Sequence, residues 1–135
     1  MEIQINYLAV LVAGVAGWLL GAIWYSPVLF YNAWLDGLGK SSEEVQEGAG
    51  PLNYLATFIA LLVMAYVMAY ILDAFQARSI WVGLQGGFWT WLGLVATTSA
   101  VNSIFAGRRL KLYLVDSGYH LVTLLLMGMI LAAWQ

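Results

Sequence analysis

The chain has 135 residues, of which 63% are hydrophobic and 9% are charged, and its formal net charge is -2. Soluble domains carry about 25% charged residues, so this composition excludes the soluble globular class and predicts an integral membrane protein. The small negative charge argues against nucleic acid as a partner. The absence of cysteine excludes disulfides, thiolate metal sites and thiol catalysis.

The first predicted transmembrane span covers residues 5–25, a stretch without a charged side chain. As a helix it fits a hydrocarbon core about 30 Å thick, because each residue adds ~1.5 Å. Gly17 and Gly21 are four residues apart and therefore lie on one face. A neighbouring helix can approach such a face closely, so we expect it to be a packing face.

Two shorter segments follow the first span. Pro27 should break or bend the helix, because proline has no amide hydrogen to donate. The aromatic segment 27–35 is too short to cross a bilayer, and we expect it to form a short helix in the membrane interface. Residues 40–50 are hydrophilic, and Ser41 or Ser42 can cap one or two acidic helical turns there. The simplest interpretation of 40–50 is a solvated connector.

The second and third predicted spans, 54–73 and 80–103, are joined by a short turn and should form an antiparallel hairpin. Asp73 and Arg78 lie in this turn. An ion pair between them at the membrane surface is the simplest interpretation, and a functional carboxylate is the alternative.

The third span contains small residues at regular helical spacing, among them Gly86 and Gly93, which predict a second packing face. The same span also carries serine, threonine and asparagine side chains, which lipid tolerates poorly. We therefore expect this helix to be the central one, with the most protein around it.

The fourth predicted span covers 116–134, with Asp116 as its N-cap and Gly128 on a further small-residue face. Four spans place both termini on one side of the membrane. The positive-inside rule puts the first and third connections inside, and both termini on the outer, periplasmic side of a bacterial inner membrane. The basic residues of these connections are Lys40, Arg108, Arg109 and Lys111.

Antiparallel threading brings several helix ends together on the inner side, and their polar side chains form a candidate site. Asp116 and His120 are four residues apart and share a helix face. A carboxylate beside an imidazole is typical of proton relays and of ligand sites. A helix cap and an interfacial histidine without any function are the simpler alternative. The candidate cluster comprises Tyr25, Asn53, Asn102, Asp116, Tyr119 and His120, beside the candidate anion- or headgroup-binding residues Arg108, Arg109 and Lys111.

Catalytic motifs are absent from the sequence. One histidine without cysteine argues against a zinc site, which needs three or four ligands. The sequence contains no nucleophile elbow, no HExxH and no phosphate-binding loop. We therefore expect no enzymatic activity, no metal and no cofactor.

Several short motifs are more specific than this general pattern. They are WYSP at 24–27, WLG at 91–93, LKL at 110–112, and GYH at 118–120 followed by MG at 127–128. With the segments around them, they resemble the bacterial membrane proteins grouped as domain of unknown function 1761 (DUF1761), over nearly the whole chain. The resemblance implies a small multi-span bacterial membrane protein with no assigned activity, and it assigns no catalytic residue.

The sequence therefore predicts an all-α membrane protein, a single domain of four transmembrane helices with a short interfacial helix after the first. The first functional hypothesis is a structural or accessory protein that forms a homo-oligomer, or binds a membrane partner, through its glycine faces. The alternative is a small transporter or channel that uses the polar cluster around Asp116 and His120. A deep polar cavity would favour transport, and a sealed bundle with a large subunit interface would favour assembly.

Overall fold

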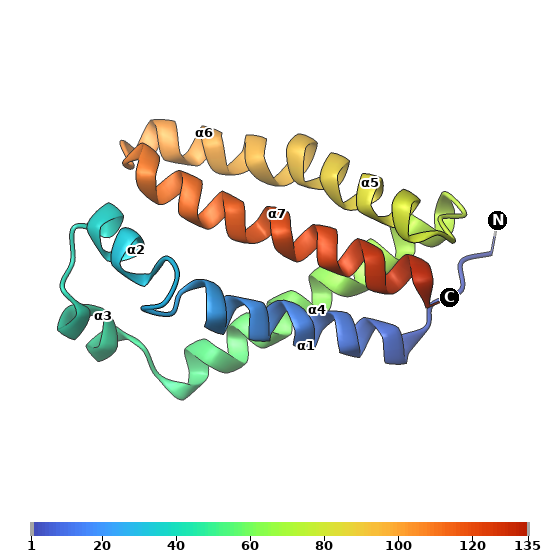
Figure 1. Cartoon of the computed structure of the whole chain (residues 1–135), viewed down its shortest axis with the longest axis horizontal. Helices are drawn as coiled ribbons and strands as arrows, with labels where there is room; N and C mark the ends of the chain where they lie inside the picture. The colour runs from blue at the N-terminus through green and yellow to red at the C-terminus, as the bar shows by residue number, and fades with distance from the viewer. Residues whose placement is uncertain (1, 135) are drawn as a thin grey trace.

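The computed structural model describes residues 2–134, and every regular element in that range is a helix, which confirms the all-α prediction. Figure 1 shows α1, α4, α7 and a rod made of α5, η1 and α6 running along the molecule, with α2 and α3 grouped at one end and both termini at the other. The helices are α1 (Tyr7–Trp24), α2 (Tyr31–Leu38), α3 (Ser42–Gly48), α4 (Pro51–Ala74), α5 (Ile80–Thr90), the π-helix η1 (Trp91–Ala96), α6 (Thr97–Ala106) and α7 (Leu110–Ala133).

Three of the described helices, α1, α4 and α7, are long and apolar enough to cross a membrane, which supports the predicted membrane class. The remaining predicted span is divided by the π-helix η1 into elements of 11, 6 and 10 residues. The backbone nevertheless stays helical through both junctions, with φ -61° and ψ -51° at Trp91 and φ -67° and ψ -45° at Thr97. By length and composition, three of the four predicted spans are therefore found as single helices.

The short elements after α1 differ in register from the prediction. The helix expected over 27–35 is α2, which begins at Tyr31 and ends at Leu38, and its C-cap Gly39 has the left-handed conformation, with φ 70°. That backbone conformation favours glycine, because a side chain would collide with the carbonyl group. The predicted acidic turns form α3, where Ser41 is the N-cap and its hydroxyl accepts a hydrogen bond from the Glu44 amide.

The start of the last helix also differs from the prediction. α7 begins at Leu110, six residues before the predicted 116, and Arg109 occupies the N-cap position. The prediction that Asp116 caps the helix is therefore wrong, since Asp116 lies in its second turn. The misleading signal was the basic cluster, which suggested a turn. Lys111 is instead exposed on the helix surface, where its charge needs no turn.

α7 is the central helix of the bundle, and it packs against α1, α2, α4, α5 and α6. Its contact with α5 is the closest, because glycines face each other there. A Cβ atom on Gly83 would collide with the Gly128 carbonyl oxygen, and one on Gly87 would collide with that of Leu124. Close backbone approach of this kind is how helices pack in a membrane, where no hydrophobic effect drives them together.

The expectation that the third span is the most enclosed is wrong. Thr97 and Thr98 of α6 are exposed, although they suggested a protein environment. Their hydroxyl groups donate to carbonyl oxygens of their own helix, Thr97 to Gly93 at 2.7 Å and Thr98 to Leu94. A hydroxyl satisfied in this way needs no neighbouring helix, so the polar residues of this span did not mark a packing face.

Four of the five glycines singled out in the sequence contact another helix of the chain. Gly17 faces Thr123 and Met127 of α7, and Gly21 faces Tyr119. Gly93 is exposed, and nothing lies within 4 Å of the position that its Cβ would occupy. The other two contacts join Gly86 to Leu72 and Gly128 to Gly83.

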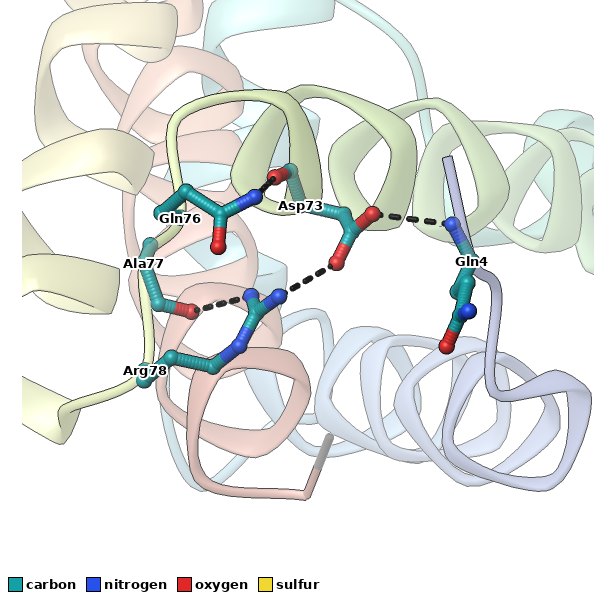
Figure 2. Close-up of polar contacts among 5 residues, drawn as sticks. All are labelled: Gln4, Asp73, Gln76, Ala77 and Arg78. Atoms are coloured by element: carbon teal, nitrogen blue, oxygen red, sulfur yellow. Dashed lines mark hydrogen bonds and ion pairs between the residues drawn. The ribbon is translucent and has the colours of Figure 1, made fainter. Parts of the chain in front are cut away.

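We call the end that holds both termini the terminal end, and a closed polar network occupies it (Figure 2). Asp73 is 4% exposed, and both of its carboxylate oxygens accept hydrogen bonds. The backbone N–H of Gln4 donates to Oδ2 at 2.9 Å, and the Arg78 guanidinium donates to Oδ1 at 2.8 Å. The predicted Asp73–Arg78 ion pair is therefore confirmed, and the amide of Gln4 in the chain before α1 is tied to the end of α4.

Candidate functional site

The candidate site lies at the opposite end of the bundle, which we call the clefted end because two clefts open there. Its residues come mainly from the first half of α7. Because this helix begins at Leu110, His120 lies ten residues inside it. At ~1.5 Å per residue this is about 15 Å along the helix axis, whereas the sequence placed His120 about one turn from the start of the helix.

The first cleft, which we call the polar cleft, lies between α6 and α7 and has a volume of about 620 Å³. Asn102, Arg108, Asp116, Ser117 and His120 all line it. His120 Nδ1 and Ser117 Oγ are buried, and neither has a hydrogen-bond partner among the described residues. An unsatisfied buried polar atom costs about 1–3 kcal/mol, so a small side-chain movement that brought either atom to the cleft would favour a polar partner there.

The second cleft, which we call the aromatic cleft, lies where the end of α1, the short helices α2 and α3 and the start of α4 face each other. Its volume is about 1220 Å³, and Tyr25, Asn53, Asp116 and Tyr119 are among the residues that line it. The Tyr25 hydroxyl donates to Asp116 Oδ1 at 2.7 Å. The Tyr119 hydroxyl donates to the Gly17 carbonyl oxygen at 2.8 Å, which fixes that ring against α1.

The structure thus divides the predicted cluster between the two clefts. Asn102 and His120 line only the polar cleft, whereas Tyr25, Asn53 and Tyr119 line only the aromatic cleft. Asp116 lines both clefts and so lies in the wall between them. Within residues 2–134, no hydrogen bond joins Asp116 to His120, although both lie on one face of α7.

The three basic residues predicted to form one anion site do not line one cleft. Arg108 alone lines the polar cleft. Arg109 donates to the Asp36 carbonyl oxygen at 2.7 Å, and the Lys111 ammonium pairs with the Asp36 carboxylate at 2.7 Å. These contacts attach α2 to the start of α7, close to where Gly37 packs on the backbone of Leu112. The hydrogen bond and charge of Lys111 lower the pKa of Asp36.

Three aromatic side chains hold the walls of the clefts in place, and sequence reasoning missed all of them. The Trp24 indole donates to the Val115 carbonyl oxygen at 3.0 Å. The Trp91 indole donates to that of Ser117 at 2.8 Å, and the Tyr113 hydroxyl donates to that of Ala96 at 2.9 Å. Trp91 and Ala96 are the first and last residues of the π-helix, so both of its ends are fixed to α7. No spacing in the sequence marks a π-helix or a carbonyl acceptor.

Three of the short motifs noted in the sequence lie at this end of the bundle. WYSP supplies Trp24 and Tyr25, LKL forms the start of α7, and GYH supplies Tyr119 and His120. A family model described as "Protein of unknown function (DUF1761)" matches residues 8–132, which is nearly the whole chain. The chain belongs to the DUF1761 family. The predicted resemblance is therefore confirmed, while no curated protein and no solved structure matches the chain.

The polar cleft of this DUF1761 protein offers hydrogen bonding, charge and proton exchange. Among residues 2–134, no group of three or more histidine, aspartate or glutamate side chains is arranged to hold a metal ion. The polar cleft combines a carboxylate, an imidazole, a guanidinium and an amide. Such a set can bind a polar molecule that both donates and accepts hydrogen bonds.

Proposed function

We propose that this DUF1761 protein is a membrane protein that binds a small polar solute in the polar cleft, which is the binding step of the transport or channel hypothesis. The observation that carries the proposal is the cleft of about 620 Å³ that Asn102, Asp116 and His120 line together. Two polar atoms beside it, His120 Nδ1 and Ser117 Oγ, are buried and have no partner among the described residues. Ionisable side chains inside membrane helices are costly, and they commonly mark solute or proton pathways.

The proposal includes a fourth span made of α5, η1 and α6 together. These elements contain 27 residues in one continuous helical run, between Arg78 and Arg108, and none of the 27 is charged. At ~1.5 Å per residue the run measures about 40 Å, enough to cross the bilayer with some tilt. The rod lies alongside α7 in Figure 1, which supports a common membrane orientation.

The proposed orientation places the clefted end in the cytoplasm and the termini on the periplasmic side of a bacterial inner membrane. It is supported by the charge distribution, since Lys40, Arg108, Arg109 and Lys111 all lie near the clefted end and only Arg78 lies at the other. Basic residues are retained on the cytoplasmic side of membrane proteins. The polar cleft would then receive its solute from the cytoplasm.

The assembly hypothesis has less support, because most of the predicted glycine faces are occupied within a single chain. Gly17, Gly21, Gly86 and Gly128 each contact another helix of the same chain, and Gly93 alone faces outward. A homo-oligomer or a membrane-protein partner stays a prediction. Mass measurement in bilayer discs tests it, and a single-chain mass would count against it.

Native mass spectrometry tests the proposed solute site. Wild-type protein released from bilayer discs should retain a small polar species that His120→Ala and Asn102→Ala lose. Asp36→Asn is the matched control, because Asp36 is a charged residue at the same end that does not line the polar cleft. Identical adducts in the wild type and all three variants, or lipid adducts alone, would contradict the proposal.

A further inference from the structure

The aromatic cleft has a lining unlike that of the polar cleft. Its rings pack edge to face, with Tyr25 and Trp34 centroids 5.4 Å apart at 65° and Tyr25 and Tyr119 centroids 5.5 Å apart at 61°. The Tyr31 hydroxyl shares a hydrogen bond with Ser42 of α3 at 2.7 Å, so the cleft is held between α2 and α3. The aromatic residues that line it are Trp18, Tyr25, Tyr31, Trp34, Tyr54 and Tyr119.

The charge of this cleft is negative. Asp116 is the one charged residue among those that line it, and no lysine or arginine of the described chain belongs to the lining. Asp116 Oδ1 accepts the Tyr25 hydroxyl, and Oδ2 has no hydrogen-bond partner within residues 2–134. Helix α3 lines the cleft with Ser42, Val45 and Gln46, none of which is charged.

We propose that the aromatic cleft binds an amphipathic organic cation, in which an alkylammonium group is attached to an apolar body. The ammonium group pairs with Asp116 and lies beside the rings of Tyr25 and Trp34, because aromatic rings attract cations through their quadrupole. A cleft of about 1220 Å³ leaves room for the apolar body against the remaining rings. This inference goes beyond the proposed solute site, since it concerns a different cleft and a different class of ligand.

The lining also narrows the choice of ligand. An anion would meet the Asp116 carboxylate with no basic side chain in the lining to offset it. Two sources of the alkylammonium group fit equally well, a free organic cation and the headgroup of an amine-bearing lipid. Both present the same chemistry to Asp116 and the rings, so competition between them identifies the source.

Equilibrium dialysis of the full chain in a non-ionic maltoside detergent tests the proposal, with benzyltrimethylammonium as the probe. Neopentylbenzene, in which carbon replaces the charged nitrogen, is the matched neutral compound. We expect saturable binding of the cation that weakens about tenfold or more in Asp116→Asn and in Trp34→Leu. Asparagine can still accept the Tyr25 hydroxyl, and the Trp34 variant covers the case in which the Asp116 variant fails to fold.

Trp81→Leu is the control for the loss of an indole ring, because Trp81 is 67% exposed and does not line the cleft. Its cation binding should equal that of the wild type, and neopentylbenzene binding should not change in Asp116→Asn.

Competition by dihexanoylphosphatidylcholine, but not by dihexanoylphosphatidylglycerol, would assign the site to a lipid headgroup, and competition by neither would assign it to a free cation. Unsaturable cation binding, or equal binding by Asp116→Asn, Trp34→Leu and Trp81→Leu, would overturn the proposal. Trp34 does not line the polar cleft, so this failure is distinct from a failure of solute retention there.

Discussion

Each end of the bundle holds one aspartate in a long apolar helix, and the two carboxylates differ in how completely they are hydrogen-bonded. At the terminal end, Asp73 is 4% exposed and both of its oxygens accept hydrogen bonds, from Gln4 and from Arg78. At the clefted end, Asp116 accepts one hydrogen bond from Tyr25 and lies between two clefts. The first carboxylate closes the structure, whereas the second leaves an oxygen available to a ligand. We infer that the terminal end contributes stability and the clefted end contributes binding.

The largest effect is expected where α5 meets α7, close to the terminal end. Gly83→Leu should destabilise the protein by about 3 kcal/mol or more, because the new side chain would collide with the backbone of Gly128 and could not be relieved by a rotamer change. Gly93→Leu is the matched control, since its position is open, and should change stability by about 0.5 kcal/mol or less. Thermal unfolding in detergent measures the stability of both variants, and an equal loss of stability in the two would contradict the observed helix contact.

The next largest effect is expected when one arginine at each end of the bundle is replaced and the melting temperatures are compared. Arg78→Gln should lower the melting temperature more than Arg109→Gln, because it removes the guanidinium that donates to a buried carboxylate. Arg109 donates to an exposed carbonyl oxygen, and contacts of that kind contribute little in water. The melting temperatures of the two variants in one detergent decide the point. A larger fall in melting temperature for Arg109→Gln would contradict the inference that the terminal end contributes stability.

A smaller effect on stability is expected at the clefted end itself. Asp116→Asn keeps an oxygen that can accept the Tyr25 hydroxyl, so the free energy of unfolding should fall by about 1 kcal/mol or less. Binding of the organic cation should nevertheless weaken about tenfold or more, because the charge that lines both clefts is removed. Chemical denaturation combined with the dialysis measurement separates the two effects. A large loss of stability would indicate that Asp116 is structural, like Asp73.

The smallest effect is a dependence on pH at the attachment of α2. Lys111 lowers the pKa of Asp36 in the folded protein below its ordinary value of 3.8. The ion pair therefore stabilises the attachment above that ordinary value, and the contribution disappears as the pH falls through the lowered pKa. The protection of the α2 amides against hydrogen exchange, corrected for the pH dependence of the intrinsic exchange rate, should fall below about pH 4 in the wild type. Asp36→Asn should remove this pH dependence, and an unchanged response in that variant would assign it to another group.

The parts of the fold that depend on local pattern could be predicted from the sequence. Uncharged runs gave the membrane class, Pro27 marked the end of α1, and the short spacing between Asp73 and Arg78 correctly indicated their ion pair. The start of α7 was misplaced because a basic cluster was interpreted as a turn. Lys111 shows why this interpretation was wrong. A lysine on an exposed helix face keeps its ammonium in water, and Lys111 pairs there with the Asp36 carboxylate.

The candidate site could be predicted only as a set of residues at one end. The sequence placed Asp116 and His120 on one helix face, but it could not show that α6 and α1 lie on different sides of that helix and divide the cluster. It also gave no sign that Thr97 bonds to its own helix, or that Trp91 reaches the carbonyl oxygen of Ser117. These features depend on three-dimensional packing and on acceptors in the backbone, which carry no residue signature.

Cysteine accessibility tests the difference between the two ends most directly. The sequence contains no cysteine, so single-cysteine variants have no background reaction. Asn102→Cys lines the polar cleft, whereas Ala69→Cys is one helical turn from Asp73 and 3% exposed. With a membrane-impermeant thiol reagent, Asn102→Cys should react in inside-out vesicles and not in intact cells, and Ala69→Cys should react in neither. Reaction of Asn102→Cys in intact cells would reverse the proposed orientation, and its failure to react from either side would contradict a water-open polar cleft.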